Sequence, residues 1–239
     1  MSKFVVKAGW KDAGHLTPEA IADMAKAYPP HELEARMNGT PSLGSGAIYP
    51  VDPQRFVVDP FELPEYWPRA FGLDVGWSNT ACMWLAWDRE SDVVYFYSEY
   101  KAGNAVPAIH ASAIKGRGAW IPGVVDPASA GSSQVDGERL IELYRAEGLD
   151  IEPADNSVEA GIYAIWQRLE AGRLKVFSSC TNWLAECQLY RRDAKGKVVK
   201  KFDHCQDAGR YGLVSGLERA RVQIRKQYQP TRGNRIFAG

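Results

Sequence analysis

The sequence lacks any apolar run long enough to cross a bilayer, and residues 1–30 contain no secretory hydrophobic segment. We therefore expect no membrane partner and a location in the cytoplasm rather than outside the cell. Cysteine is scarce, and Cys82, Cys180, Cys187 and Cys205 form neither a CxxC pair nor zinc-finger spacing. This spacing predicts reduced thiols and excludes a disulfide-stabilised scaffold.

The chain also lacks net charge, because 29 Lys and Arg residues balance 29 Asp and Glu residues. The two signs are nevertheless separated along the sequence. Residues 71–190 carry 9 basic and 16 acidic side chains, a balance of −7, whereas residues 191–239 carry 13 basic and 4 acidic ones, a balance of +9. This pattern suits a protein that collects divalent cations at one place and holds a polyanion at another. A solvated basic tail is the alternative.

Residues 1–69 are interpreted as an N-terminal adaptor or linker region that packs on the core. A helix is expected to begin at Thr17, which caps it, and to stop before the Pro29-Pro30 pair. A second short helix is expected over 31–37. The stretch 38–69 is rich in Gly, Pro and Asp, which predicts loops and a short hairpin.

From residue 70 the apolar pattern becomes regular and predicts alternating strands and helices. Strands are expected over 70–77, 81–88, 92–100, 119–126, 150–154 and 173–178, and helices over 105–116, 137–148 and 157–172. The order β-β-β-α-β-α-β-α is that of a ribonuclease-H-like α/β fold, a mixed sheet with helices on both faces. We expect this domain to span 70–220, with a hairpin at about 188–202 and a basic tail over 221–239.

Two carboxylates fall where buried apolar side chains are expected. Asp74 lies in the first strand of "FGLDVGW", and Asp126 ends the fourth strand in "GVVDPAS". These strands are neighbours in such a sheet, and adjacent carboxylates destabilise each other unless they share a proton or bind a cation. Mg²⁺ and Mn²⁺ take oxygen ligands. The alternative is that each acid caps a turn at the end of its strand.

A third acid is expected on a late helix that begins at about Asp203. The spacing places His204, Asp207 and Tyr211 on one face of that helix. Asp203 is interpreted either as an N-cap or as a ligand, and His204 either as a packed histidine or as a metal ligand. For Asp207 the alternative to a ligand is an exposed acid that pairs with Arg210 or Tyr211.

Basic residues are concentrated just before this helix. The turn-forming sequence Asp193-Ala194-Lys195-Gly196 predicts a hairpin that could hold DNA phosphates beside the acids. The basic side chains on it are Arg191, Arg192, Lys195, Lys197, Lys200 and Lys201. Lysines also protect exposed edge strands from aggregation, which is the alternative interpretation.

Residues 71–220 resemble the nuclease domain of the large terminase subunit of tailed bacteriophages. The resemblance rests on "GLDVGW", "VVDPAS", "NSVEAGI", "GRLKVF" and above all the pattern DHxxDAxRY, and it extends back through "HLTPEAIADMAKAYPP". It implies that acids matching Asp74, Asp126 and Asp207 bind the catalytic metals. It also implies that His204, or an acid near Asp203, assists them. Whether Asp203 or Asp207 is the third ligand stays open.

The resemblance implies a metal-dependent endonuclease that cleaves concatemeric double-stranded DNA during viral genome packaging, with two Mg²⁺ or Mn²⁺ ions. The implied partners are DNA, a terminase ATPase domain, the small terminase subunit and the portal, in the cytoplasm of an infected bacterial host. No GxxxxGK[ST] phosphate loop occurs in the 239 residues, so we expect an excised nuclease domain, monomeric in isolation, rather than the packaging motor.

Three other functions are compatible with parts of the sequence. "LDVGWSNT" also resembles the phosphate-binding strand of actin-like and sugar-kinase ATPases, although Pro127 follows Asp126 where that family has glycine. A RuvC-like junction resolvase shares the topology and the metal chemistry. A non-catalytic DNA-gripping or docking module of the packaging motor would have the same acids without cleavage.

Overall fold

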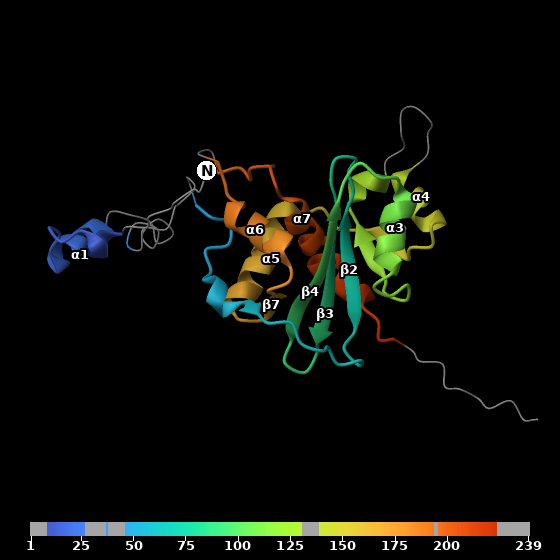
Figure 1. Ribbon diagram of the computed structural model, residues 1–239, viewed down its shortest axis with the longest axis horizontal. Helices are drawn as coiled ribbons and strands as arrows, with labels where there is room; N and C mark the ends of the chain where they lie inside the picture. The colour runs from blue at the N-terminus through green and yellow to red at the C-terminus, as the bar shows by residue number, and fades with distance from the viewer. Residues whose placement is uncertain (1–8, 27–36, 38–45, 131–138, 194–195, 224–239) are drawn as a thin grey trace, which may run out of the picture.

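The computed structural model describes residues 9–26, 37, 46–130, 139–193 and 196–223. Its central feature is a seven-stranded mixed sheet with the order β1-β7-β4-β3-β2-β5-β6. Helices α3 and α4 cover one face of the sheet, and α5, α6 and α7 cover the other (Figure 1). The expected ribonuclease-H-like α/β fold is confirmed.

The strands are β1 (Val57–Val58), β2 (Arg69–Asp74), β3 (Thr80–Asp88), β4 (Val93–Ala102), β5 (Gly123–Val125), β6 (Ile151–Pro153) and β7 (Leu174–Phe177). The α-helices are α1 (Pro18–Lys26), α3 (Pro107–Lys115), α4 (Leu140–Ala146), α5 (Val158–Glu170), α6 (Thr181–Leu189), α7 (His204–Tyr211) and α8 (Leu217–Arg219). A π-helical turn, Gly212–Gly216, joins α7 to α8. Short 3₁₀ turns lie at Trp10–Asp12, Pro53–Arg55 and Pro127–Ala130.

The predicted order of elements between residues 70 and 178 agrees with the structure. Strands β2, β3 and β4 form the antiparallel part of the sheet, and β5, β6 and β7 join it in parallel. Helix α1 begins at Pro18 as expected, whereas residues 31–36 of the second expected helix lie outside the described residues. No prediction anticipated α6, because its sequence has no side-chain N-cap and few apolar residues in a regular stripe.

The short hairpin expected within 38–69 is not present in residues 46–69, and residues 38–45 lie outside the described residues. Val57 and Val58 instead form β1, which pairs in parallel with Val176 and Phe177 of β7. The nearby Ile48, Tyr49, Val51 and Phe56 are buried in the same core as β7 and α5. The segment 46–58 is therefore part of the folded sheet and its core.

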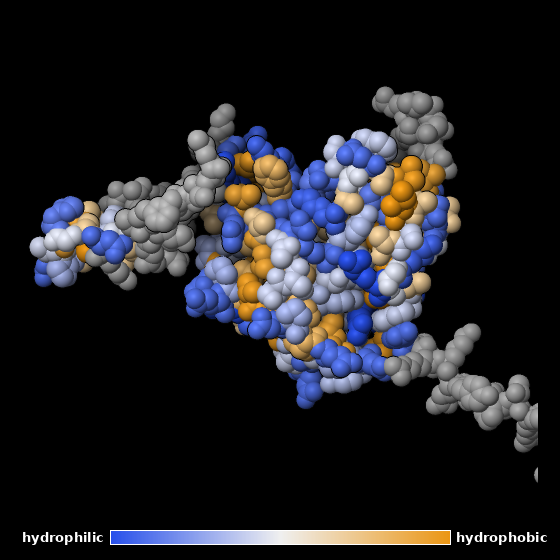
Figure 2. Space-filling model, viewed as in Figure 1, coloured by the Kyte–Doolittle hydropathy of each residue, from blue (hydrophilic) through white to orange (hydrophobic). Residues whose placement is uncertain are grey.

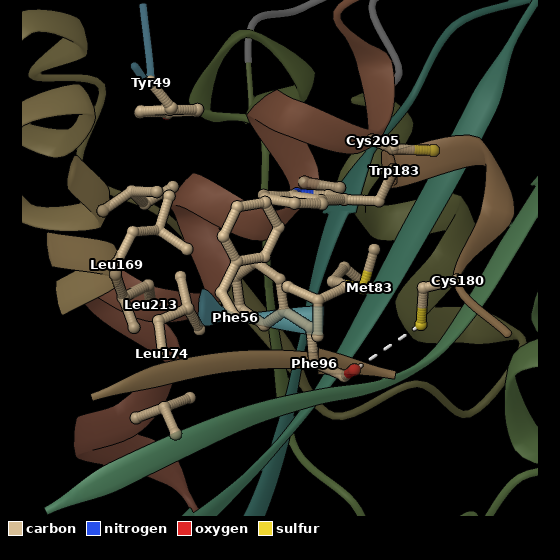
Figure 3. Close-up of a cluster of buried hydrophobic side chains, with 14 of the residues drawn as sticks. Tyr49, Phe56, Met83, Phe96, Leu169, Leu174, Cys180, Trp183, Cys205 and Leu213 are labelled. Carbon is tan, nitrogen blue, oxygen red and sulfur yellow. Dashed lines mark hydrogen bonds between the residues drawn. The ribbon is translucent and has the colours of Figure 1, made fainter. Parts of the chain in front are cut away.

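The core lies on both sides of β3, the central strand. Residues Ala81 to Ala86 are completely buried, because alternate side chains of β3 point to opposite covered faces. On the face covered by α5 to α7, Phe56, Phe96 and Trp183 pack edge to face, with ring centroids 5.5–6.2 Å apart (Figure 3). The thiol of Cys180 donates to the carbonyl oxygen of Phe96 in this cluster, with a distance of 3.5 Å.

Helix α7 lies unusually close to β2. A Cβ atom at Gly72 would lie 2.0 Å from the carbonyl oxygen of Ala208 and 2.5 Å from the nitrogen of Gly212. Any side chain at Gly72 would therefore push α7 away from the sheet. This contact sets the position of the helix that carries His204 and Asp207.

The four cysteines are unpaired, and three of them, Cys82, Cys180 and Cys205, are buried. In the part of the chain that is described, no helix has both the length and the apolar character needed to span a bilayer.

Candidate active site

Asp74 and Asp126 follow directly paired residues on adjacent parallel strands. Leu73 of β2 pairs with Val125 of β5, and the backbone N–H of Asp126 donates to the Leu73 carbonyl at 2.9 Å. Adjacent strands lie about 4.8 Å apart. The two carboxylates therefore start from neighbouring backbone positions at one edge of the sheet, as expected from the sequence.

Asp74 is mostly buried and is paired with His204 of α7. Its Oδ2 lies 2.8 Å from Nδ1 of His204, and only 14% of the Asp74 side chain is exposed. Burial raises the pKa of Asp74, the nearby Asp207 and Asp126 raise it further, and His204 opposes them. The hydrogen bond to Asp74 in turn raises the pKa of His204. Asp207 and Asp126 lie near enough to this pair to act on the Asp74 charge.

Asp126 has two structural contacts in addition to its place beside Asp74. Its Oδ1 accepts a hydrogen bond from the Ala128 N–H at 3.1 Å, which caps the turn that begins at Pro127. The Tyr211 hydroxyl of α7 donates to the same oxygen at 3.2 Å. The turn-capping alternative thus describes one real contact, while Tyr211 ties this acid to the helix that carries Asp207.

Asp207 is buried, with 8% of the residue exposed, so it is not the exposed helix acid of the alternative interpretation. Its Oδ2 pairs with Lys200 Nζ at 2.9 Å, and its Oδ1 accepts hydrogen bonds from Arg210 at 3.0 and 3.2 Å. Arg210 itself is only 2% exposed. Both oxygens of Asp207 therefore face a cationic side chain.

Asp203 lies at the N-cap position of α7 and is also buried, with 7% exposed. Its side chain makes no capping hydrogen bond, and its Oδ2 has no hydrogen-bond donor. The nearest cation is Lys200, whose Nζ lies 3.5 Å from Oδ2. A buried carboxylate oxygen without a donor is costly, so this oxygen is suited to an additional cationic ligand.

Glu186 of α6, which the sequence analysis missed, positions the start of α7. Its Oε2 accepts hydrogen bonds from the backbone N–H groups of Cys205 and Gln206 at 2.7 and 3.2 Å. Its Oε1 pairs with Lys101 of β4 at 2.6 Å. These residues are far apart in the sequence and no local pattern links them, so only the tertiary structure could reveal the contact.

The basic residues predicted to bind DNA occupy different surroundings. Arg192 forms an isolated bridge with Val198, as a hairpin requires, and pairs with Glu159 at 2.6 Å. Arg191 bridges to Ala47, Lys200 pairs with Asp207, and the Lys201 ammonium lies 5.1 Å from the centre of the Phe202 ring. The backbone N–H of Lys197 donates to Asp193, and Lys195 lies outside the described residues.

The donor atoms have the chemistry that a divalent cation requires, since carboxylates from β2, β5 and α7 converge with a histidine nearby. In the arrangement that the structure describes, however, no group of three or more His, Cys, Asp and Glu residues is placed to hold a metal ion. In this arrangement Lys200 pairs with one oxygen of Asp207 and Arg210 with the other. Lys200 would compete with a cation for Asp207 Oδ2.

These features define an α/β domain of the ribonuclease-H-like class, with acids at the carboxyl ends of two paired strands and on the helix behind them. The Terminase RNaseH-like domain model matches residues 71–215, and the chain belongs to this family.

The chain is 33% identical over 234 residues to the large terminase subunit of Salmonella phage P22, a match that covers 94% of this chain and 47% of that protein. It thus spans about half the length of that relative. The solved nuclease domain of the P22 large terminase has 31% identity and a TM-score of 0.69, covering 76% of this chain and 97% of that one. The manganese-bound nuclease domain of the bacteriophage SPP1 large terminase shares the fold, with 17% identity, a TM-score of 0.50, and coverage of 65% and 92%.

Proposed function

We propose that the chain is a divalent-metal-dependent endonuclease that cuts concatemeric double-stranded DNA during viral genome packaging. The observation that carries the proposal is the placement of Asp74 and Asp126 after paired residues of β2 and β5, facing the helix that carries Asp207. Its membership of the terminase family and its similarity to the P22 nuclease domain support this choice among ribonuclease-H-like activities. They give no such support to an actin-like ATPase or a RuvC-like resolvase.

In the proposed site Asp74 would contribute to holding both cations, and Asp126 and Asp207 would each help to hold one of them. Two bound Mg²⁺ or Mn²⁺ ions would supply an activated water and neutralise the charge on the leaving oxygen of the phosphodiester. The chain's own residues hold and orient the site. His204 fixes the Asp74 carboxylate through its 2.8 Å hydrogen bond, and Tyr211 fixes Asp126. Basic side chains of 191–201 would position the DNA backbone, and a cleavage-site preference would need other contacts, because phosphates carry no base information.

The test is conversion of supercoiled plasmid to nicked and linear DNA with Mn²⁺, with Mg²⁺ and with EDTA. Manganese is included because the SPP1 domain was solved with it bound. Wild-type protein is compared with Asp126→Asn, which keeps the hydrogen-bond acceptor for Ala128 while removing the negative charge. Asp193→Asn, in the hairpin turn before α7, is the matched control outside the acidic site.

We expect cleavage that requires the metal, a loss of at least about 100-fold in Asp126→Asn, and little change in Asp193→Asn. The circular dichroism spectrum and Tm of Asp126→Asn should stay close to wild type, because its side chain is partly exposed. Full activity of folded Asp126→Asn would refute the proposed mechanism.

One observation favours a second candidate, a DNA-gripping or docking module without cleavage. Asp207 is neutralised by Lys200 and Arg210, as a carboxylate with a purely structural role would be. A folded protein that binds DNA but neither binds Mn²⁺ nor cuts plasmid would support this candidate.

The remaining partners follow from the proposal and from family membership. We propose that the chain works next to a terminase ATPase domain, with the small subunit and the portal, in the cytoplasm of the infected host. Co-purification of this chain with a separately expressed terminase ATPase domain would test the first of these contacts.

A further inference from the structure

Two aromatic residues that are close in sequence to residues of the acidic site have side chains exposed to solvent. Trp77 is 70% exposed and Phe202 is 53% exposed. Trp77 follows Asp74 by three positions, and Phe202 precedes His204 by two. The side chains of Asp74 and His204 meet, with Oδ2 of Asp74 2.8 Å from Nδ1 of His204. The turn from β2 to β3 and the segment that leads into α7 lie on the same upper side of the molecule in Figure 1. Two separate segments, each within three residues of one member of this pair, therefore carry an exposed ring.

Backbone contacts hold the turn that carries Trp77, although the Trp77 side chain is exposed to solvent. The Trp77 carbonyl accepts a hydrogen bond from the Asn104 N–H at 2.8 Å, and the Gly76 carbonyl accepts one from the Thr80 hydroxyl at 3.0 Å. A Cβ atom at Gly103 would lie 2.0 Å from the Ser78 carbonyl oxygen, so the turn rests directly on that glycine. The structure therefore presents the indole from a rigid support.

Phe202 has an unusual backbone as well as an exposed ring. Its φ of 57° lies in the left-handed region, which is unfavourable for a bulky residue without a special reason. The Lys201 ammonium lies 5.1 Å from the centre of its ring, and the next residue, Asp203, is buried. Strained conformations of this kind tend to persist at functional sites.

Single exposed apolar side chains are common on protein surfaces and need no explanation. Trp77 and Phe202 differ because both lie within three residues of an acid or histidine of the site, and Phe202 directly follows the basic segment 191–201. Aromatic rings interleaved with lysines are the combination that binds nucleic acid, since bases stack on the rings while phosphates contact the cations. Figure 2 shows hydrophilic residues of the described surface around this upper side.

We propose that Trp77 and Phe202 contact the bases of the DNA strand whose phosphate is held at the acids, by stacking or wedging against the base rings. The inference rests on the proposed nuclease function and adds to it a sequence-tolerant contact, because every base has an aromatic face. Inserted apolar side chains also unstack and bend duplex DNA, which would expose the phosphodiester at that step.

The test measures the Kd of duplex DNA by fluorescence anisotropy for wild type, Trp77→Ala, Phe202→Ala and Trp77→Phe. In this binding assay Ca²⁺ replaces Mg²⁺ and Mn²⁺, because Ca²⁺ also binds through oxygen ligands. Tyr66→Ala and Tyr163→Ala are matched controls, since their exposed fractions of 70% and 54% equal those of the two test residues within 1%. Tyr66 precedes β2, at the end opposite Asp74. Plasmid cleavage with Mn²⁺ is measured for every variant in parallel.

We expect the alanine variants to bind DNA about 5- to 100-fold more weakly, with an unchanged dependence on salt, and the controls to stay within about twofold. Trp77→Phe should keep most of the affinity because it keeps a ring. The difference in fluorescence between wild type and Trp77→Phe isolates this indole among the 8 tryptophans, and DNA should quench it. A purely structural role would not produce that quenching.

Equal affinities for the test and control variants, in a protein that binds and cuts DNA, would overturn the aromatic contact and leave the nuclease proposal intact. Equal losses in Trp77→Phe and Trp77→Ala would also overturn it. Wild-type protein that neither binds nor cuts DNA would overturn both proposals.

Discussion

At the scale of single residues, Lys200 is the group that most directly controls the acids. Its ammonium lies 2.9 Å from Asp207 Oδ2 and 3.5 Å from Asp203 Oδ2, so it serves both carboxylates. Burial lowers the pKa of Lys200, but the hydrogen bond to Asp207 and the charges of both acids raise it overall. The lysine is therefore protonated at neutral pH and competes with any metal ion for the same oxygens.

We expect Lys200→Ala to bind Mn²⁺ more tightly than wild type, by about 3- to 30-fold, because it removes one competing positive charge. Isothermal titration calorimetry with Mn²⁺ measures this directly. Lys175→Ala, another lysine that makes a hydrogen bond but lies on β7, is the control and should leave the affinity unchanged. Weaker Mn²⁺ binding in Lys200→Ala would mean that the lysine orders Asp207 rather than competing for it.

At the scale of elements, α7 depends on a carboxylate from another helix and on a glycine in the sheet. Glu186 is 4% exposed and satisfies two backbone N–H groups at the start of α7. It also neutralises Lys101, whose side chain is 20% exposed. Helix α7 is thus fixed at its N-terminal end by a buried charge and along its length by the close approach at Gly72.

We expect Glu186→Ala to lower the free energy of unfolding by about 3 kcal/mol, because it leaves a partly buried ammonium and two backbone donors without their partner. Urea denaturation at pH 7 measures the change. Glu170→Ala is the matched control: Glu170 pairs with Arg55 at the surface, and its removal should cost less than about 1 kcal/mol. Similar losses in both variants would contradict a special role for Glu186.

The β3–β4 turn is tied to α5 and β7 through Asp92, which predicts a pH dependence of stability. Burial raises the pKa of Asp92, but Arg168, the Trp87 N–H and Arg173 together lower it by more, so the net shift is downward. The unfolded pKa of aspartate is about 3.9. Because the folded pKa is lower, the stabilisation is complete above about pH 4 and is lost as the pH falls through the folded pKa.

We therefore expect Asp92→Asn to lose less than about 1 kcal/mol at pH 7, because 38% of the side chain is exposed. Its stability should also decline less steeply than that of wild type between pH 4 and pH 2. Asparagine tolerates the φ of 53° at this position, so the backbone is preserved. Urea midpoints measured across that range test the prediction, and parallel curves for the two proteins would contradict it.

At the scale of the whole molecule, the sheet extends N-terminal to residues 71–215, the region that the family model matches. Phe56 is 2% exposed and packs edge to face against Trp183, and its carbonyl accepts a hydrogen bond from the Val176 N–H at 2.8 Å. The segment 46–58 thus completes the core beneath β7 and α6. Helix α6 in turn supplies Glu186, so packing in this segment bears on the position of α7.

We expect Phe56→Ala to cost about 3–5 kcal/mol of stability, through lost burial and the cavity that remains. Thermal unfolding followed by circular dichroism measures the loss. Tyr66→Ala removes an aromatic ring that is 70% exposed and should change Tm by little. A Tm for Phe56→Ala equal to that of wild type would show that segment 46–58 contributes nothing to the cooperative unit.

Much of the fold was predictable because its signals are local. The strands around Leu73, Met83 and Phe96 consist of β-branched, aromatic and other apolar residues bounded by turn-forming ones, and the helices from Pro107 and Val158 begin after clear breaks. Helix α6 and strand β1 were missed for the opposite reason. Strand β1 has only 2 residues and α6 is weakly patterned, and both form because neighbouring elements pack against them.

By itself the sequence determined the class of sheet, the neighbouring strands that end at Asp74 and Asp126, and the acids and basic residues gathered near residue 200. Each of these depends on short-range patterns or on the connectivity rules of mixed sheets. Only the tertiary structure decided which groups meet: His204 with Asp74, Tyr211 with Asp126, Lys200 and Arg210 with Asp207, and Glu186 with the start of α7. Such contacts join residues from separate elements, and their distances depend on how closely α7 packs on Gly72, which no local pattern records.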